Sequence, residues 1–301
     1  MLTRKDIGRL LTSGLQTVFM KGRDSVVSIF PEFSTEIKSN KASEEYGWLW
    51  GVGGLKKWID ERTPRALREN GFSLKNKDYE NTIEVDRNAL EDDQYGQIKI
   101  RTQTMGAAAK QSYDKFAAEV VNNWHLSACY DGQNFFDTDH EEGESGVQLN
   151  YYDSWKALSA TNLQLIMTNM RRFKSDDGEL AGINPTHLMV PSILEWKAKE
   201  ILDPAFVGVT TDPSKAVMKG LLKVIVNPYL TGADTDAAYY VMDLSGAVKP
   251  IIYQNRKDLE FTALDDPTSP EYFHRKKIFY GVDARFAFGY GDWRMMFKAK
   301  G

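Results

Sequence analysis

The chain has 301 residues, of which 42% are hydrophobic and 27% are charged, and its formal net charge is −4 at pH 7. This length and composition suit a globular protein with a sizeable core. Proteins that bind nucleic acid tightly usually have a net positive charge, because their basic residues displace the counterions of the phosphates. The net negative charge of this chain argues against that class. No apolar run is long enough to cross a bilayer, and the N-terminal residues lack the apolar core of a secretory signal. The single cysteine, Cys129, excludes an internal disulfide.

Residues 1–45 are polar and have no continuous apolar pattern. Apolar residues have helical spacing only around Ile7, Leu10, Leu11 and Leu15. Residues 36–45 are mostly small and charged. Terminal segments of this kind are poorly ordered unless something fixes them. The sequence therefore predicts an extended or partly mobile N-terminal arm.

Residues 46–93 contain stretches in which side chains alternate in character, as is typical of β-strands. Apolar residues alternate with charged ones along 79–86, and Asn70-Gly71 is a turn signal. We predict a long β-hairpin that is exposed on both faces. Because an isolated hairpin is marginal in water, a neighbouring molecule is expected to cover it. Aromatic residues are enriched at the centres of interfaces, and the candidates for contact between subunits are Trp48, Trp50, Trp58, Tyr79, Ile83 and Val85.

Residues 94–128 predict one long helix. Their apolar residues recur at spacings of three and four, with Gly106 as a weak point; the stripe contains Met105, Ala109, Tyr113, Phe116, Val120 and Trp124. At 1.5 Å per residue this helix is about 50 Å long. A second helix follows, with Leu163, Ile166, Met167 and Met170 on one face.

The last third of the chain predicts a compact α/β region and then more sheet. Strands are expected at 187–190, 223–226 and 239–243, with a shorter one at 251–253 and a helix at 192–202. The final alternation over 284–297 changes phase at Gly291-Asp292, which indicates a bulge or a tight turn.

Few residues suggest chemistry. Asp131, Asp137, Asp139 and His140 could form a calcium or magnesium site, but their spacing matches no known loop and favours a solvated surface loop. His125 and Cys129 lie four apart, as zinc ligands might, yet no second pair completes a tetrahedron. The sequence contains neither a Gly-x-Ser-x-Gly elbow nor an HExxH pair. We expect no catalytic residue, no metal and no cofactor.

Several short blocks resemble the Mu-like major head subunits of tailed bacteriophages. The most distinctive block is Cys129–Asp137, with the sequence CYDGQNFFD. Others occur in the same order along the chain: 46–49, 55–58, 79–85, 90–93, 185–191, 247–250 and 280–285. The resemblance implies an α+β chain with the Hong Kong 97-type capsid fold. Its parts would be an N-terminal arm (1–45), an extended β-hairpin loop (46–93), a peripheral domain with a long spine helix (94–182), an α/β axial domain (183–262) and a return to the peripheral sheet (263–301).

The same resemblance implies a function, namely a major capsid protein that self-assembles into the icosahedral head shell around phage double-stranded DNA. The expected assembly is a homo-oligomer of hexamers and pentamers, built in the host cytoplasm, with the DNA contacted only weakly. No long scaffold-like segment precedes the arm, so a separate scaffolding protein is expected, together with a maturation protease and a portal. Two alternatives stay open at this point: a cellular nanocompartment shell with the same fold, and a metal-dependent enzyme that uses the Asp131–His140 cluster.

Overall fold

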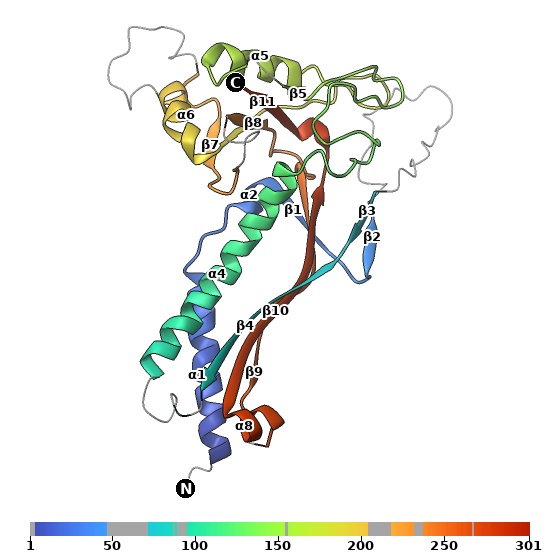
Figure 1. Ribbon diagram of the computed structural model, residues 1–301. Helices are drawn as coiled ribbons and strands as arrows, with labels where there is room; N and C mark the ends of the chain where they lie inside the picture. The colour runs from blue at the N-terminus through green and yellow to red at the C-terminus, as the bar shows by residue number, and fades with distance from the viewer. Residues whose placement is uncertain are drawn as a thin grey trace.

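Two β-sheets organise the chain in the computed structural model, which describes residues 4–46, 72–86, 88, 95–153, 156–203, 218–231, 237–266 and 268–301. A four-stranded sheet with two long helices makes an elongated half. A five-stranded sheet with two shorter helices makes a compact half at its upper end (Figure 1). The two ends of the chain lie at opposite ends of the molecule.

Helix α4, Tyr95–Asn122, confirms the predicted long helix. Its 28 residues correspond to about 42 Å. The predicted stripe is central to its packing, because Met105 and Tyr113 are buried. The helix is shorter than expected, since turns replace it from residue 123 onward.

Helix α1, Arg4–Asp24, corrects the prediction of an extended N-terminal arm. It packs along α4, and its Leu15 and Phe19 side chains are fully buried. The two backbones touch at glycines, since a Cβ atom on Gly106 would lie 2.2 Å from the carbonyl oxygen of Phe19. A Cβ atom on Gly22 would lie 2.0 Å from the carbonyl oxygen of Gln103. Gly106 is therefore a contact point between α1 and α4. From the sequence alone, this glycine was expected only to weaken the long helix.

The four-stranded sheet has the order β1-β9-β10-β4 and lies beside α1 and α4 (Figure 1). Its strands are β1 (Ser34–Lys38), β9 (Ile251–Leu264), β10 (Lys277–Tyr290) and β4 (Lys77–Asp86). Strand β1 runs parallel to β9, and the other pairs are antiparallel. Helix α8, Pro270–Arg275, connects β9 to β10 at the far end.

Strand β4 differs from the exposed ribbon that the alternation suggested. It pairs with β10 along ten residues, and Val85 is buried. Its side chains Glu80, Thr82 and Glu84 stay exposed on the other face. The reason is that its partner strand lies about 200 positions later in the chain. The base of the predicted hairpin is present as β2 (Ser43–Glu45) paired with β3 (Ser73–Lys75), whereas residues 47–71 lie outside the described ranges.

The compact half confirms the predicted α/β elements. Its sheet has the order β5-β11-β8-β6-β7, with strands Tyr151–Tyr152, Met296–Lys300, Ala238–Met242, His187–Val190 and Lys223–Val226. Helix α5 spans Ala160–Met170 and α6 spans Glu195–Leu202, preceded by the short 3₁₀ helix η1, Ser192–Leu194.

The apolar alternation was predicted to change phase at Gly291-Asp292. In the structure the chain passes at this point from the four-stranded sheet to the five-stranded sheet. A short 3₁₀ helix, η3 (Trp293–Met295), follows it, and β11 then joins the five-stranded sheet instead of returning beside α4. A Cβ atom on Gly291 would lie 2.2 Å from the carbonyl oxygen of Lys249, so only glycine fits at this crossing.

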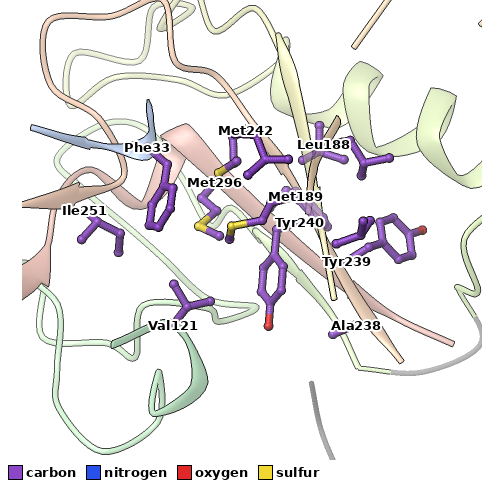
Figure 2. Close-up of a cluster of buried hydrophobic side chains, with 14 of the residues drawn as sticks. Phe33, Val121, Leu188, Met189, Ala238, Tyr239, Tyr240, Met242, Ile251 and Met296 are labelled. Carbon is purple, nitrogen blue, oxygen red and sulfur yellow. The ribbon is translucent and has the colours of Figure 1, made fainter. Parts of the chain in front are cut away.

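One large core connects the two halves. It includes Phe33 of the short helix α2 (Phe30–Phe33), Val121 of α4 and Ile251 of β9, all buried. Figure 2 shows these residues close to side chains of the five-stranded sheet, among them Met189, Tyr240 and Met296. Among the helices described, none is long and apolar enough to span a membrane.

Candidate functional site

A buried polar network lies where the loop over residues 129–150 meets the passage between the sheets. Arg294 donates to both carboxylate oxygens of Glu142, at 2.8 and 3.2 Å. The Tyr130 hydroxyl donates to Glu142 at 2.6 Å, and the Trp293 indole does so at 2.9 Å. Burial alone would lower the pKa of Arg294, but the surrounding groups Asp292, Tyr130 and Glu142 raise it. The network holds these charges in place, and its Arg294, Glu142 and Tyr130 side chains are buried.

The proposed metal cluster is part of the same loop. The Asp131 carboxylate lies 2.5 Å from Nδ1 of His140, and both side chains are almost fully buried. Asp137 accepts from Asn134 at 3.2 Å, while Asp139 is exposed. Within the described ranges, no group of three or more His, Cys, Asp or Glu side chains could hold a metal ion. The structure thus joins two of the four residues in a hydrogen bond, and the four do not form a group that could hold a metal ion.

His125 and Cys129 do not form a site together. His125 is exposed, whereas Cys129 is buried, with its Sγ 3.9 Å from the carbonyl oxygen of Gly291. Burial raises the pKa of the Cys129 thiol well above its usual value. A thiol that stays protonated is a poor nucleophile and a poor metal ligand.

The predicted contact residues on β4 face the chain's own core. The ring of Tyr79 stacks on Phe286, with centroids 4.4 Å apart, and contacts Phe116 at the same distance. Val85 is buried and Ile83 packs against the same cluster of side chains beneath α1 and α4. These residues fix β4 onto the elongated half. Trp48, Trp50 and Trp58 lie outside the described residues.

Several large apolar side chains are exposed on the single chain. Val27 between α1 and α2 is 91% exposed, Leu126 after α4 is 71% exposed, and Trp196 on α6 is 63% exposed. Others are Ile100, Val147, Leu180, Ile193 and Leu221. Single exposed apolar residues are ordinary, but these are distributed over both halves of the molecule. No pattern in the sequence distinguishes these exposed residues, because the same residue types also fill the core.

An open groove adds to these surfaces. It has a volume of about 350 Å³ and runs between β3, the C-terminal part of α4 and the end of β10. Its walls include Phe72, Leu74 and Phe288, and the exposed Leu126 stands at its edge. Lys75, Lys77 and Glu119 also line the groove, so its surface combines apolar and charged side chains.

The chain matches a family model described as Mu-like prophage major head subunit gpT, over residues 9–152, 143–230 and 231–301. The chain belongs to this family. It is 28% identical over 296 residues to the Mu-like prophage FluMu major head subunit of Haemophilus influenzae, a match that covers 98% of this chain and 74% of that protein. It is 24% identical over 300 residues to the major capsid protein of Escherichia phage Mu, covering 100% of this chain and 75% of that protein.

Solved capsid structures share the fold of this head subunit. The procapsid of bacteriophage JBD30 matches with a TM-score of 0.59 and 25% identity, over 97% of this chain and 75% of that chain. A virus-like particle from Pyrococcus furiosus matches with a TM-score of 0.52 and 10% identity, over 95% and 98% of the two chains. The second likeness shows the fold alone. The predicted Hong Kong 97-type α+β fold is confirmed.

The head subunit is therefore the major capsid protein of a phage head, a structural protein of the virion shell and not an enzyme. Neither the nanocompartment shell nor the metal-dependent enzyme is favoured by these comparisons. The buried charges at residues 130–142 and 292–294 have a structural role, and the functional surfaces of this protein are those that meet its neighbours.

Proposed function

We propose that the subunit assembles through repeated heterologous contacts into hexamers and pentamers that close into an icosahedral shell around double-stranded DNA. The observation that carries the proposal is the set of exposed apolar side chains on both halves of an elongated molecule. A contact between two different surfaces leaves each subunit free to bind the next, so it generates rings and closed shells. Each exposed apolar side chain that a neighbour covers contributes about 1.5–3 kcal/mol before ordering costs.

In this proposal the extended loop over residues 46–93 reaches a neighbouring subunit with the part beyond β2 and β3, while β4 stays paired with β10 of its own chain. The pair β2–β3 supports it, because these strands hold the two ends of residues 47–71 together at the edge of the molecule. Trp48, Trp50 and Trp58 would be the anchors of that contact. Tyr79, Ile83 and Val85 would act indirectly, by fixing β4 to its own chain.

The further division of the chain also belongs to the proposal. Residues 1–45, 94–182 and 263–301 would form the peripheral part with the spine helix, and residues 183–262 the axial part. In this division each sheet contains strands of both parts, since β9 pairs with β10 and β11 pairs with β8. A net charge of −4 supports only weak contact with the packaged DNA. A separate scaffolding protein, a maturation protease and a portal would complete the assembly.

Electron microscopy of the purified full-length chain tests the proposal directly. Rings, sheets or closed shells are expected, with a matching fast-sedimenting species in analytical ultracentrifugation. A monodisperse monomer under all salt, pH and crowding conditions would refute the assembly proposal.

The anchors are tested separately by replacing Trp48, Trp50 and Trp58 with alanine together. We expect the variant to keep the circular dichroism spectrum of the wild type and to lose assembly, because aromatic side chains dominate interface centres.

A matched control replaces charged residues of the same segment, Lys56, Arg62 and Glu69, with alanine. Charges at an interface rim contribute little, so the control is expected to assemble nearly as well as the wild type. Equal assembly of both variants would remove the tryptophans from the proposal and leave shell formation standing.

A further inference from the structure

The ring of His140 lies between two hydrogen-bond acceptors. Its Nδ1 is 2.5 Å from the Asp131 carboxylate, and its Nε2 is 3.2 Å from Oδ1 of Asn150. The side chain is fully buried. A neutral imidazole has one N–H donor and one acceptor nitrogen, whereas the imidazolium has two donors.

The orientation of Asn150 is fixed by its surroundings. Its Nδ2 donates to the carbonyl oxygens of Phe135, Trp293 and Met296, at 2.8 to 3.2 Å. Its Oδ1 accepts from the backbone N–H of Asp137 at 2.9 Å. A flipped amide would place an NH₂ group against a backbone N–H, so the atom facing His140 is an oxygen that must accept.

Asp131 also acts as an acceptor. Its other carboxylate oxygen accepts from the backbone N–H of Gln133 at 3.1 Å. A proton shared between free imidazole and carboxyl groups belongs on the imidazole, whose ordinary pKa is about 6.5 against about 3.9. Both ring nitrogens of His140 therefore meet acceptors.

The charges of the surrounding network lead to the same conclusion. Three carboxylates with side chains no more than 12% exposed, those of Asp131, Glu142 and Asp292, lie near one buried guanidinium, that of Arg294. The Trp293 ring stacks on His140, with centroids 4.1 Å apart, and the Arg294 guanidinium lies 5.0 Å from the same ring. Buried charges are costly unless they are balanced, so a second cation is required here.

We propose that His140 is an imidazolium in the folded subunit and that its second proton is a latch, which fastens the loop over residues 129–150 to the chain segment between the two sheets. Loss of that proton breaks one hydrogen bond of the ring and leaves the Asp131 carboxylate without its cation. The charged groups that face the latch are Asp131, Arg294, Glu142 and Asp292, with Tyr130 behind Glu142. Asp139, its exposed neighbour, and Asp137, behind Asn150, add negative charge.

The latch acts through charge as well as through hydrogen bonds. A neutral side chain at position 140 would leave the Asp131 carboxylate buried without a cation beside it, which is costly. This inference concerns the folded subunit and does not depend on how the shell assembles.

Solid-state NMR of the full chain labelled with ¹⁵N-histidine tests the protonation state whether or not the protein assembles. The chain has only four histidines, at 125, 140, 187 and 274. At pH 7, His140 is expected to show two protonated ring nitrogens and no imine nitrogen. An imine signal assigned to His140 would overturn the inference. Assignment comes from the loss of one signal set in His140→Gln or, if that variant does not fold, by elimination with glutamine at the other three positions.

A second measurement follows the latch itself. His140→Gln has a neutral side chain of similar length, so its Tm at pH 7 is expected to lie below that of the wild type, because the Asp131 carboxylate loses its cation. His125→Gln, at an exposed histidine, is the matched control and is expected to keep the Tm of the wild type. A His140→Gln variant as stable as the wild type would refute the latch.

Discussion

Replacing Gly106 with alanine sets two effects of opposite sign against each other. In an isolated helix the change would stabilise α4 by up to about 1 kcal/mol, because glycine is a poor helix former. In the folded chain, however, the new Cβ atom would lie 2.2 Å from the carbonyl oxygen of Phe19, where ordinary contacts begin at 3.4 Å. The atom it meets belongs to the backbone of α1, so α1 must move by about 1 Å.

The size of the loss follows from what α1 buries. Leu15 and Phe19 are both 0% exposed, and full burial of such side chains stabilises by about 1.5–3 kcal/mol each. Complete loss of the helix contact would therefore cost about 3–6 kcal/mol from these two residues alone. A partial shift resembles overpacking, which costs about 1–3 kcal/mol. We expect a net loss of about 1–3 kcal/mol.

The assay compares the urea midpoint of unfolding with amide hydrogen exchange over α1. The variant is expected to unfold at lower urea and to exchange faster across residues 13–24. Gly96→Ala is the control, because no atom lies within 4 Å of its Cβ position, and it is expected to be neutral or slightly stabilising. A Gly106→Ala variant as stable as the wild type, with α1 equally protected, would refute the packing argument.

Three further predictions concern buried polar groups. Arg294→Met leaves the Glu142 carboxylate buried without its cation and is expected to cost about 3–5 kcal/mol in urea unfolding; Arg294→Lys should rescue little, because the bidentate geometry is lost. Lys298 is fully buried, with its Nζ 4.4 Å from the ring centre of Trp124. Lys298→Met should stay within about 1 kcal/mol of the wild type, whereas Lys298→Ala should lose about 2–5 kcal/mol by leaving a cavity. Burial raises the pKa of Tyr46 to about 12, and its hydroxyl donates to Gln254 at 2.6 Å. Its stabilising effect should be complete below pH 10 and disappear as the pH rises through 12, and absorbance titration of Tyr46→Phe should show one late-ionising tyrosine fewer.

The sequence predicted elements whose partners lie near in the chain or whose pattern is strong. The stripe of α4 repeats over many turns, so the helix could be read directly, and the strands of the compact half are short apolar runs between turns. The helical spacing around Ile7–Leu15 lies within helix α1, but the sequence did not show that the helix continues to Asp24. Its close backbone contact with Gly106 is between distant residues, and no local pattern reveals such a contact.

Strand β9 shows why strand lengths are hard to predict. Its expected end was Tyr253, since polar residues follow from Gln254 onward. In the structure the Gln254 side chain is buried and donates to Asn76 and to the carbonyl oxygen of Leu74, about 180 positions away. Polar residues can continue a strand when distant groups satisfy their hydrogen bonds. The pairing of Glu142 with Arg294, 152 positions apart, escaped prediction for the same reason.

The chain segment between the two sheets has to resist bending between the two halves of the molecule. The chain passes from one sheet to the other at Gly291, and the buried ion pair of Arg294 with Glu142 lies beside that point. For an elongated shell subunit the stiffness of this place matters most, because a rotation of roughly 5° would displace the far end of a helix about 42 Å long by about 4 Å. Close-packed interfaces do not tolerate such a displacement. A network of hydrogen-bonded charges has fewer alternative arrangements than an apolar contact, since each displaced group would lose a partner. This explains why the subunit buries Arg294, Glu142 and His140 beside a crossing between its two halves.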